Sequence, residues 1–307
     1  MKEKIKKILK RVLFGIIIIA FIIALAFGMH TAYKYYNGVN LTQLSPQTKS
    51  QMMGYIIKTK TGKVIVVDGG TPGDGENLRK YIRKYGNKVD AWFLTHPHRD
   101  HVGAFIDTVN KDSDIKIKKI YKSMDTIDEI EKYQSEREND AKDLFTAFDN
   151  TNVKDNIEEV TLGENIQIDN VSVEVLGVKN PEITNNYGNN SSMVLKVHVN
   201  NKSILFLGDT GLESGNKLIS MYPKEKLKSD IVQMAHHGQA GASEKLYEVI
   251  DPKIALWPTP EWLWDDDTGE GTGSGNWKTL DTRAWMDNIG VKKNYVAKDG
   301  DITIRVW

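Results

Sequence analysis

The stretch Thr95-His96-Pro97-His98-Arg99-Asp100-His101 is the most informative part of this 307-residue chain. It places three of the chain's seven histidines and one aspartate within six consecutive residues. Neutral imidazole and carboxylate are ligands that zinc and similar divalent metals prefer. A polar loop that happens to be rich in histidine is the plainer interpretation. Four ligand-type side chains at this spacing favour a metal site instead.

The flanking residues predict rigid elements on both sides of this loop. Residues 90–94 read as a short buried strand, and residues 102–106 begin a helical pattern. A tight loop between a strand and a helix can aim several ligands at one point. We therefore expect the loop to form one wall of a site.

Three further polar clusters follow other predicted strands. Asp68 comes directly after the apolar run 63–67, Asp209 follows the run 203–207 and one glycine, and His236-His237 follow the run 231–235. Adjacent histidines point to different sides, so we expect at most one of the pair to be a ligand. The other would orient a ligand or contact substrate. Strand-end positions allow all these side chains to converge.

Composition excludes several classes of site. The chain is 40% hydrophobic and 27% charged, as in ordinary globular proteins, and it has no cysteine for a disulfide or a thiolate metal site. Its net charge is zero, but residues 34–307 carry 35 Lys and Arg against 40 Asp and Glu. A mildly acidic body disfavours non-specific nucleic-acid binding, which depends on neutralising phosphates.

The amino-terminal residues 1–33 predict a basic cytoplasmic end followed by a transmembrane anchor. Six Lys and Arg lie between Lys2 and Arg11, and residues 12–29 are apolar over about 27 Å of helix, close to the thickness of a bilayer core. Positive charge at this end favours keeping it in the cytoplasm, so the body would lie outside the cell. The alternative is a signal peptide cleaved near Ala24-Leu25-Ala26, which would give a secreted protein.

The remainder of the chain is expected to form a tether and one domain. Residues 34–50 are polar with a Ser45-Pro46 turn and predict a tether, and residues 51–307 mix strands and helices. This order indicates an α/β (α+β) layered sandwich with helices outside two sheets. Residues 124–148 predict a helical insertion over the surface.

Together these motifs resemble the metallo-β-lactamase-fold hydrolase superfamily. The central match is the His-x-His-x-Asp-His signature at His96, His98, Asp100 and His101, and it extends over residues 51–307. Within the superfamily, the run 190–195 and the His-His-Gly ending are most similar to the exterior domain of bacterial DNA-uptake competence channels. Secreted phosphorylcholine esterases are a related branch. The resemblance implies an αββα sandwich with metals at one edge.

The resemblance also implies a role for each site residue. His96 and His98 would hold one metal, and Asp100 and His101 a second. Asp209 would lie between the two metals, with His236 (or His237) completing the second. The catalytic set would comprise Asp68 as an orienting carboxylate, Asp100 and His237. The implied cofactor is Zn²⁺, as one or two ions, with Mn²⁺ as an alternative. Many members have another histidine before the Gly-Asp pair, whereas this chain has Asn189, Asn190 and Ser191, so occupancy by two metals is a hypothesis.

The function expected from this pattern is a membrane-anchored exterior hydrolase that uses a metal-activated water on a phosphodiester. Neither a Ser-His-Asp arrangement nor a P-loop is evident in the sequence. Five tryptophans between Trp257 and Trp285 adjoin an acidic loop, which could hold a quaternary ammonium group, although packing explains tryptophans more simply. The alternatives are a non-catalytic exterior binding or assembly module, and a lactone or β-lactam hydrolase.

Overall fold

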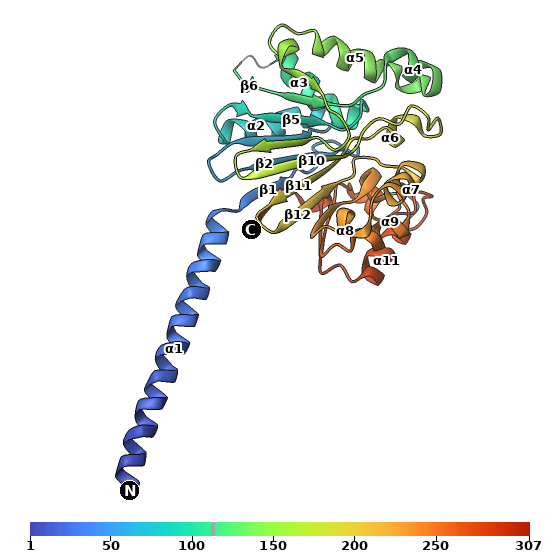
Figure 1. Ribbon diagram of the computed structural model, residues 1–307. Helices are drawn as coiled ribbons and strands as arrows, with labels where there is room; N and C mark the ends of the chain where they lie inside the picture. The colour runs from blue at the N-terminus through green and yellow to red at the C-terminus, as the bar shows by residue number, and fades with distance from the viewer. Residues whose placement is uncertain (112–113) are drawn as a thin grey trace.

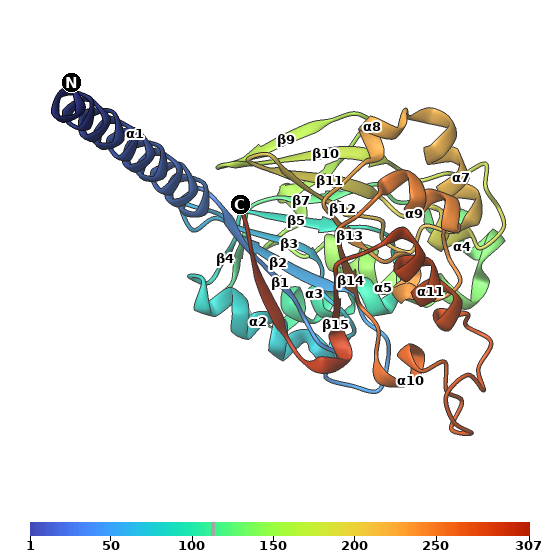
Figure 2. The same ribbon diagram turned by 90° about the horizontal axis from the view of Figure 1, so that it is seen from below.

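The computed structural model describes residues 1–111 and 114–307 and shows two sheets packed face to face between layers of helices (Figures 1 and 2). The strands of the first sheet lie in the order β16-β1-β2-β3-β5-β7-β8, and those of the second in the order β15-β14-β13-β12-β11-β10-β9. The first sheet comprises β1 (Val39–Gln43), β2 (Gly54–Lys58), β3 (Val64–Asp68), β5 (Ala91–Leu94), β7 (Ile120–Lys122), β8 (Ile157–Glu159) and β16 (Ile302–Val306). The second comprises β9 (Asn165–Ile168), β10 (Val171–Gly177), β11 (Val194–Val199), β12 (Lys202–Phe206), β13 (Ile231–Gln233), β14 (Ile254–Trp257) and β15 (Lys293–Val296). A small separate pair is formed by β4 (Lys88–Val89) and β6 (Lys116–Ile117).

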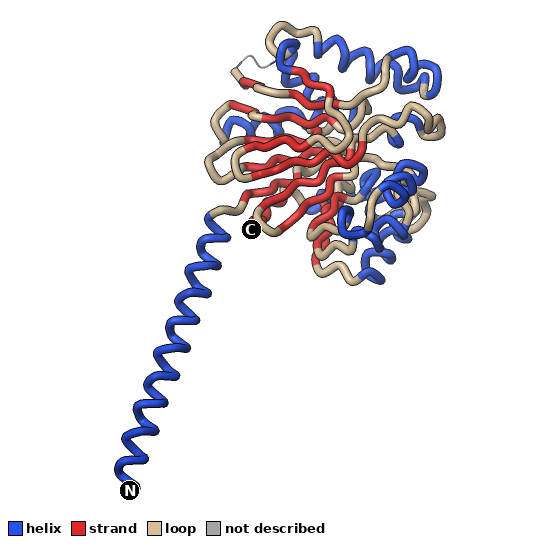
Figure 3. Tube along the Cα trace, in the orientation of Figure 1, coloured by secondary structure: helices blue, strands red, loops and turns tan. Residues whose placement is uncertain are grey.

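Helices cover the outer face of each sheet, so the αββα sandwich expected from the sequence is confirmed (Figure 3). The first sheet is covered by α2 (Gly75–Lys84), α3 (Arg99–Lys111) and α5 (Glu138–Phe148). The second is covered by α7 (Leu212–Met221), α8 (Lys224–Leu227), α9 (Glu244–Ile250) and α11 (Thr279–Ile289). The other helices are α1 (Lys2–Tyr36), α4 (Ile127–Tyr133), α6 (Tyr187–Asn190), α10 (Glu261–Trp264) and the short 3₁₀ turns η1 (Pro72–Asp74), η2 (Ser135–Arg137), η3 (Lys154–Asn156), η4 (Ala235–Gly238) and η5 (Ala297–Asp299).

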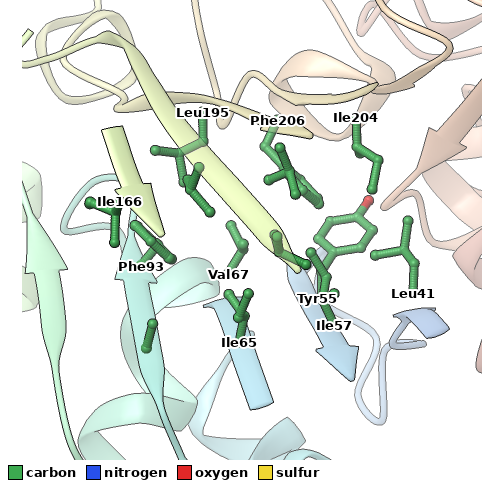
Figure 4. Close-up of a cluster of buried hydrophobic side chains, with 14 of the residues drawn as sticks. Leu41, Tyr55, Ile57, Ile65, Val67, Phe93, Ile166, Leu195, Ile204 and Phe206 are labelled. Atoms are coloured by element: carbon green, nitrogen blue, oxygen red, sulfur yellow. The ribbon is translucent and has the colours of Figure 1, made fainter. Parts of the chain in front are cut away.

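Strand β3 shows why these sequences form buried strands. Its side chains alternate between two cores: Ile65 and Val67 contact the core between the sheets, and Val64 and Val66 contact the core under the helices. A strand covered on both faces is uniformly apolar rather than alternating. Figure 4 shows the inter-sheet core, where the ring of Tyr55 packs edge-on against Phe206 at 5.1 Å.

The two sheets follow the same pattern of strand directions. In each, three antiparallel pairs at one side are followed by three parallel pairs at the other. The change occurs at β3, between β2 and β5, in the first sheet and at β12, between β11 and β13, in the second. The strands at which the direction changes therefore occupy equivalent places in the two sheets. The predicted site residues follow the carboxyl ends of β3 and β5 in the first sheet and of β12 and β13 in the second.

Residues 34–50 differ from the predicted tether. Helix α1 continues to Tyr36, and Val39–Gln43 forms strand β1, paired on one side with β2 and on the other with β16. The segment looks polar because Asn40, Thr42 and Gln43 alternate with the buried Val39 and Leu41. The folded body therefore begins at Val39, directly after the helix.

Candidate metal centre

The predicted strand-end residues meet at one edge between the two sheets. Asp68 is the last residue of β3, and the loop containing His96 and His98 follows β5. From the other sheet, Asp209 follows β12 and His237 lies in η4 after β13. The side chains thus converge as the sequence predicts, because the carboxyl ends of four neighbouring strands lie at the same edge.

Two groups of potential metal ligands lie side by side in this edge. His96, His98 and Asp209 form the first group, and Asp100, His101 and His237 form the second; within each, the ligand atoms lie within 4.8 Å of one another. All six residues are buried except Asp100, which is partly exposed. No other such group occurs among residues 1–111 and 114–307.

Asp209 connects the two groups. Its Oδ2 lies 3.8 Å from His96 Nε2 and 3.5 Å from His237 Nε2, while its Oδ1 lies 3.1 Å from His101 Nε2. This one carboxylate faces histidines of both groups. This arrangement would allow one carboxylate to be shared between two adjacent metal positions.

The histidines of the first ligand group are oriented by hydrogen bonds to side chains outside the group. Thr95 Oγ1 donates to Asp68 and therefore accepts from His96 Nδ1, at 3.1 Å, which leaves the buried His96 Nε2 without a hydrogen-bond partner. Gln134 Oε1 accepts from the Gly188 amide and also from His98 Nε2, at 3.2 Å, so His98 Nδ1 is the unprotonated nitrogen. The partnerless His96 Nε2, which lies 3.8 Å from Asp209 Oδ2, fits a bound cation.

The histidines of the second group are held more directly. Asp68 Oδ2 accepts from His101 Nδ1 at 2.7 Å, and the Pro258 carbonyl accepts from His237 Nδ1 at 3.1 Å. Both Nε2 atoms then face inward, 3.3 Å apart. Asp68 and His237 have positive φ angles of 54° and 57°, which non-glycine residues seldom adopt and which functional sites often retain. Asp68 thus occupies the orienting position that the resemblance implies.

His236, expected to complete the second group, lies outside both groups. Its Nδ1 donates to the Ala240 carbonyl at 2.8 Å, and its Nε2 lies 3.2 Å from Asn189 Nδ2. Both residues of the pair have left-handed backbone angles in η4, so their rings diverge, and only His237 turns into the buried edge. The structure therefore replaces His236 with His237 as the inward-facing histidine.

The electrostatics of the site suit a cation. Burial holds the pKa of His96 well below its ordinary value and lowers the pKa of His98 to about 4, so both rings are neutral at pH 7. Burial works against ionised Asp209, but His101 and His237 outweigh it and keep the pKa of this carboxyl low. Burial also opposes a charged His237, yet Asp209 and Asp100 raise its pKa to about 9. Protons on the second group would be displaced by a metal ion.

Residues 189–191, the region without the expected histidine, contain two asparagines that make different contacts. Asn190 Oδ1 accepts the Ser214 amide and so binds the first turn of α7, which is structural. Asn189 is buried, and its Oδ1 has no hydrogen-bond partner, although its Nδ2 contacts His236. Ser192 lies beside the first group, 3.3 Å from His96 Nδ1, and accepts the Asp209 amide. Among these residues, Asn189 alone offers a buried oxygen that remains free.

Sequence reasoning missed two glutamines that support the site. Gln134, from the insertion between α4 and η2, contacts His98, and a Cβ on Gly188 would lie 2.5 Å from both Gln134 Oε1 and His98 Nε2. Gln51 Nε2 donates to Asp100 Oδ2 at 3.0 Å and is itself bonded by Gln239. A lone glutamine in a polar segment carries no sequence signal for this role.

The tryptophan-rich segment is mostly explained by packing. Trp257 is buried and meets Trp264 edge-on at 5.1 Å, and Trp262 meets Trp277 at 4.9 Å. Trp285 packs against the core under the helices of the second sheet, and it also lines a groove of about 490 Å³ that includes Glu213, Glu244, Asp281 and Ala240, the residue bonded to His236. The simpler interpretation thus applies to all five rings, and Trp285 also lines this groove.

Comparison with known families identifies this arrangement. The family model of the metallo-beta-lactamase superfamily matches residues 53–256, about two thirds of the chain. The chain belongs to the metallo-beta-lactamase superfamily. The family resemblance drawn from the His-x-His-x-Asp-His signature is confirmed, and the ligand groups at the sheet edge are those of a divalent metal site of this superfamily.

Individual relatives agree with this assignment. The chain is 28% identical over 171 residues to ComE operon protein 3 of Bacillus subtilis, which supports the competence branch of the resemblance. The match covers 55% of this chain and 20% of that protein, so this chain spans about a fifth of its relative. The metallo-beta-lactamase fold protein YhfI from Bacillus subtilis aligns with a TM-score of 0.53 at 13% identity, over 88% of this chain and 100% of YhfI. CmlA, a diiron beta-hydroxylase from Streptomyces venezuelae, aligns with a TM-score of 0.53 at 12% identity, over 88% of this chain and 54% of CmlA. These two likenesses concern the fold alone.

Proposed function

We propose that this metallo-beta-lactamase superfamily protein is a metal-dependent hydrolase that acts on a phosphodiester. The observation that carries the proposal is the pair of buried ligand groups that share Asp209. Two adjacent cation positions suit a reaction in which charge develops on both the attacking and the leaving oxygen, as in phosphodiester cleavage. The chemistry that divalent ions would supply here is a nucleophilic water at neutral pH and stabilisation of negative phosphoryl oxygens.

The chain's own residues prepare the site for this chemistry. Asp68 holds His101 and also accepts the backbone amide of Thr95, so one carboxylate fixes both a ring and the start of the loop. Gln51 fixes Asp100, and the Pro258 carbonyl fixes His237. Such outer contacts set the tautomers and directions of metal ligands. We assign Asp68 a positioning role, and assign the six residues of the two groups to metal binding.

The identity of the metal is part of the proposal. Histidine and carboxylate ligands without sulfur suit Zn²⁺, and they also suit Mn²⁺ and iron. The same fold is found in CmlA, a diiron enzyme. We propose zinc as the resident metal, and the test below includes the other two ions.

We propose that α1 anchors the protein in a membrane. It is the one helix in the described part of the chain that is long and apolar enough to span a bilayer, and none of its residues is buried in the body. The basic residues before position 12 favour a cytoplasmic amino terminus, which would place the body from Val39 onward outside the cell. The substrate would then be an exterior phosphodiester.

The acidic groove beside His236 supports a substrate that carries a positive group. Three acidic residues, Glu213, Glu244 and Asp281, line it against one basic residue, Lys278, together with the Trp285 ring. Carboxylates beside an aromatic face attract quaternary ammonium ions. The same acidic lining disfavours a nucleic acid, which would add many negative charges.

The test is a reconstituted assay of the full chain in detergent. Protein loaded with Zn²⁺, Mn²⁺ or Fe²⁺ would be assayed on bis-p-nitrophenyl phosphate, a phosphorylcholine ester, single-stranded DNA, a lactone and a β-lactam, with metal content measured on the same samples. We expect metal-dependent turnover of the phosphodiester, abolished in His98→Ala and unchanged in Lys142→Gln on α5. Bound metal without turnover of any substrate would indicate a binding module. Turnover of the β-lactam or lactone alone would contradict the phosphodiester proposal.

A further inference from the structure

A groove of about 610 Å³ opens on the body beside the carboxyl end of α1. Its apolar part comes from strands of both sheets, including Ile231, Ile254 and Ile304. Around these side chains lie four basic residues against a single acidic one, Asp230. The basic residues are Lys34, Lys202, Lys253 and Arg305. The groove is thus an apolar surface with a positively charged border, and the hydrolase site does not use it.

The groove is fixed relative to the proposed anchor. The Arg305 guanidinium donates to the Tyr35 carbonyl at 2.6 Å and to the Tyr36 carbonyl at 3.3 Å, and the Trp307 ring contacts the Tyr35 ring. Only Asn37 and Gly38 separate α1 from β1. Since no flexible tether intervenes, the groove and the helix end move together.

The height of the groove follows from helix geometry. If the apolar run ends at Met29, Tyr36 lies seven residues farther along α1, which is about 10 Å at 1.5 Å per residue. The polar layer of a bilayer extends roughly 5–8 Å beyond the hydrocarbon core on each side. Tyr33, Tyr35 and Tyr36 are exposed, as is typical of aromatic residues at a membrane interface. The groove begins at Lys34, which lies five residues, or about 7.5 Å, beyond Met29, so its border lies at the outer edge of the headgroup layer.

The charges in the groove are suited to phosphate. Within the described part of the chain, Arg305 donates to neutral oxygens alone, the two carbonyls of α1 and Asn40 Oδ1, so no carboxylate there neutralises its charge. Lys34 has no ion pair within residues 1–111 and 114–307, whereas Lys202 and Lys253 each face one aspartate. Two uncompensated cations beside the headgroup layer attract an anionic lipid.

We propose that this groove binds the phosphate headgroup of an anionic phospholipid and holds the body against the membrane surface; the proposal rests on α1 being the membrane anchor. Strand β1 leaves the anchor and runs toward the same edge as β3, since both are antiparallel to β2. The metal centre after β3 therefore lies at the opposite end of the sandwich, about 16 Å away for a five-residue strand. Docking would direct the centre away from the bilayer, toward substrates outside it rather than toward lipids of the same membrane.

The experiment uses the full chain in vesicles and the natural absence of cysteine. Asn201→Cys puts a single fluorescent label in the groove, and Asn152→Cys puts the same label on an exposed asparagine just after α5, which lies at the far end of the body from α1 (Figure 1). The vesicles contain phosphatidylcholine with or without about 30% phosphatidylglycerol, enough to create a negative surface. A spin label on the lipid headgroups quenches the fluorescence of the protein label when the two come into contact.

We expect strong quenching at position 201 in the anionic vesicles, little in the neutral ones, and none at 152 in either. Lys34→Gln and Lys253→Gln should each lower the ratio of docked to undocked protein about fivefold, the effect of one charge near an anionic surface. Lys142→Gln is the matched control, since Lys142 is similarly exposed and also faces one acid. High salt should reproduce the lysine variants.

Each alternative outcome has a distinct meaning. Binding to the vesicles themselves is measured by flotation in a density gradient. If the chain did not float with neutral vesicles, the anchor would be refuted, and the docking proposal with it. Flotation with equal quenching in both vesicle types, or quenching unchanged in Lys34→Gln and Lys253→Gln, would overturn the docking proposal alone. Phosphodiester turnover, measured on the same samples, tests the hydrolase independently.

Discussion

The two ligand groups of the metal centre are held by different parts of the fold. In the second group, His101 is bonded by Asp68 at the end of β3, and His237 by the carbonyl of Pro258 just after β14. In the first group, His98 is bonded by Gln134, which belongs to the helical insertion. The second group is therefore built from strand ends, whereas the first depends on a surface segment.

This difference predicts unequal metal sites. A carboxylate behind a histidine both orients the ring and increases its basicity, while an amide only orients it. The region of Asn189, Asn190 and Ser191 also lacks the histidine that many superfamily members have before the Gly-Asp pair. We infer that the second group holds its metal more tightly and that the first can be emptied selectively.

The largest effect should follow from removing the residue that joins the groups. Asp209→Asn keeps the size of the side chain but removes the charge that faces both sets of histidines. We expect metal content to fall in both sites and activity to fall by more than about 100-fold, since outer partners of metal ligands alone cost about 10–100-fold. Elemental analysis and the phosphodiester assay measure the two quantities.

The matched control for this change is Asp74→Asn. Asp74 is also buried, but it caps η1 through Thr71 and lies outside both groups. Its loss should lower the free energy of unfolding by about 1–3 kcal/mol while leaving metal content unchanged. Normal metal content in Asp209→Asn would show that this carboxylate is not shared.

The next effect separates the adjacent histidines. His237→Ala removes an inward-facing member of the second group, so we expect about a 100-fold loss of activity and loss of the tighter metal. His236→Ala removes a ring bonded to Ala240 and Asn189, so we expect less than about a tenfold loss. Equal losses in the two variants would refute the assignment of His237.

A smaller effect should distinguish the groups through their glutamines. Gln134→Leu removes the acceptor behind His98 and should weaken the first metal about tenfold, while Gln51→Leu should affect only the second by releasing Asp100. Competition with a chelator measures each affinity. Gln134→Glu, which retains an acceptor, should restore the first site. Weakening of both metals by either variant would show that the groups are not independent.

The sequence predicted most of the fold because its strands are covered on both faces. The predicted runs 63–67 and 203–207 lie within one residue of strands β3 and β12. Strand β1 was missed because its polar residues alternate with only two core positions, Val39 and Leu41. Pairing with β16, more than 250 residues later, defines that strand, and local patterns do not contain such information.

The sequence predicted which residue types form the site, but not which way each side chain points. The side chains of His96, His98, Asp100 and His101 meet at one edge as the signature predicts, and Asp68 and Asp209 converge with them, while their roles as ligands stay a prediction. The choice between His236 and His237 depended on the left-handed backbone of η4, which two adjacent histidines do not reveal. Gln134 was invisible for a different reason, since it reaches the site through tertiary packing of an insertion.

The smallest expected effect is an increase in the affinity of the first group for its metal. Asn189 Oδ1 is buried without a partner next to Gly188, whose backbone packs against Gln134 and His98. Asn189→His would add an imidazole in the region that lacks the superfamily histidine, and we expect the affinity of the first metal to rise a few-fold, with the second unchanged. Asn189→Ala should lower the first affinity by a similar factor, because it removes the free oxygen. Chelator competition checks both variants against Asn186→Ala, which alters the hydrogen bond to Asn189 Nδ2 but leaves that oxygen in place. If Asn189→Ala left the first affinity unchanged, the weakness of the first site would have to arise from Gln134 rather than from the missing histidine.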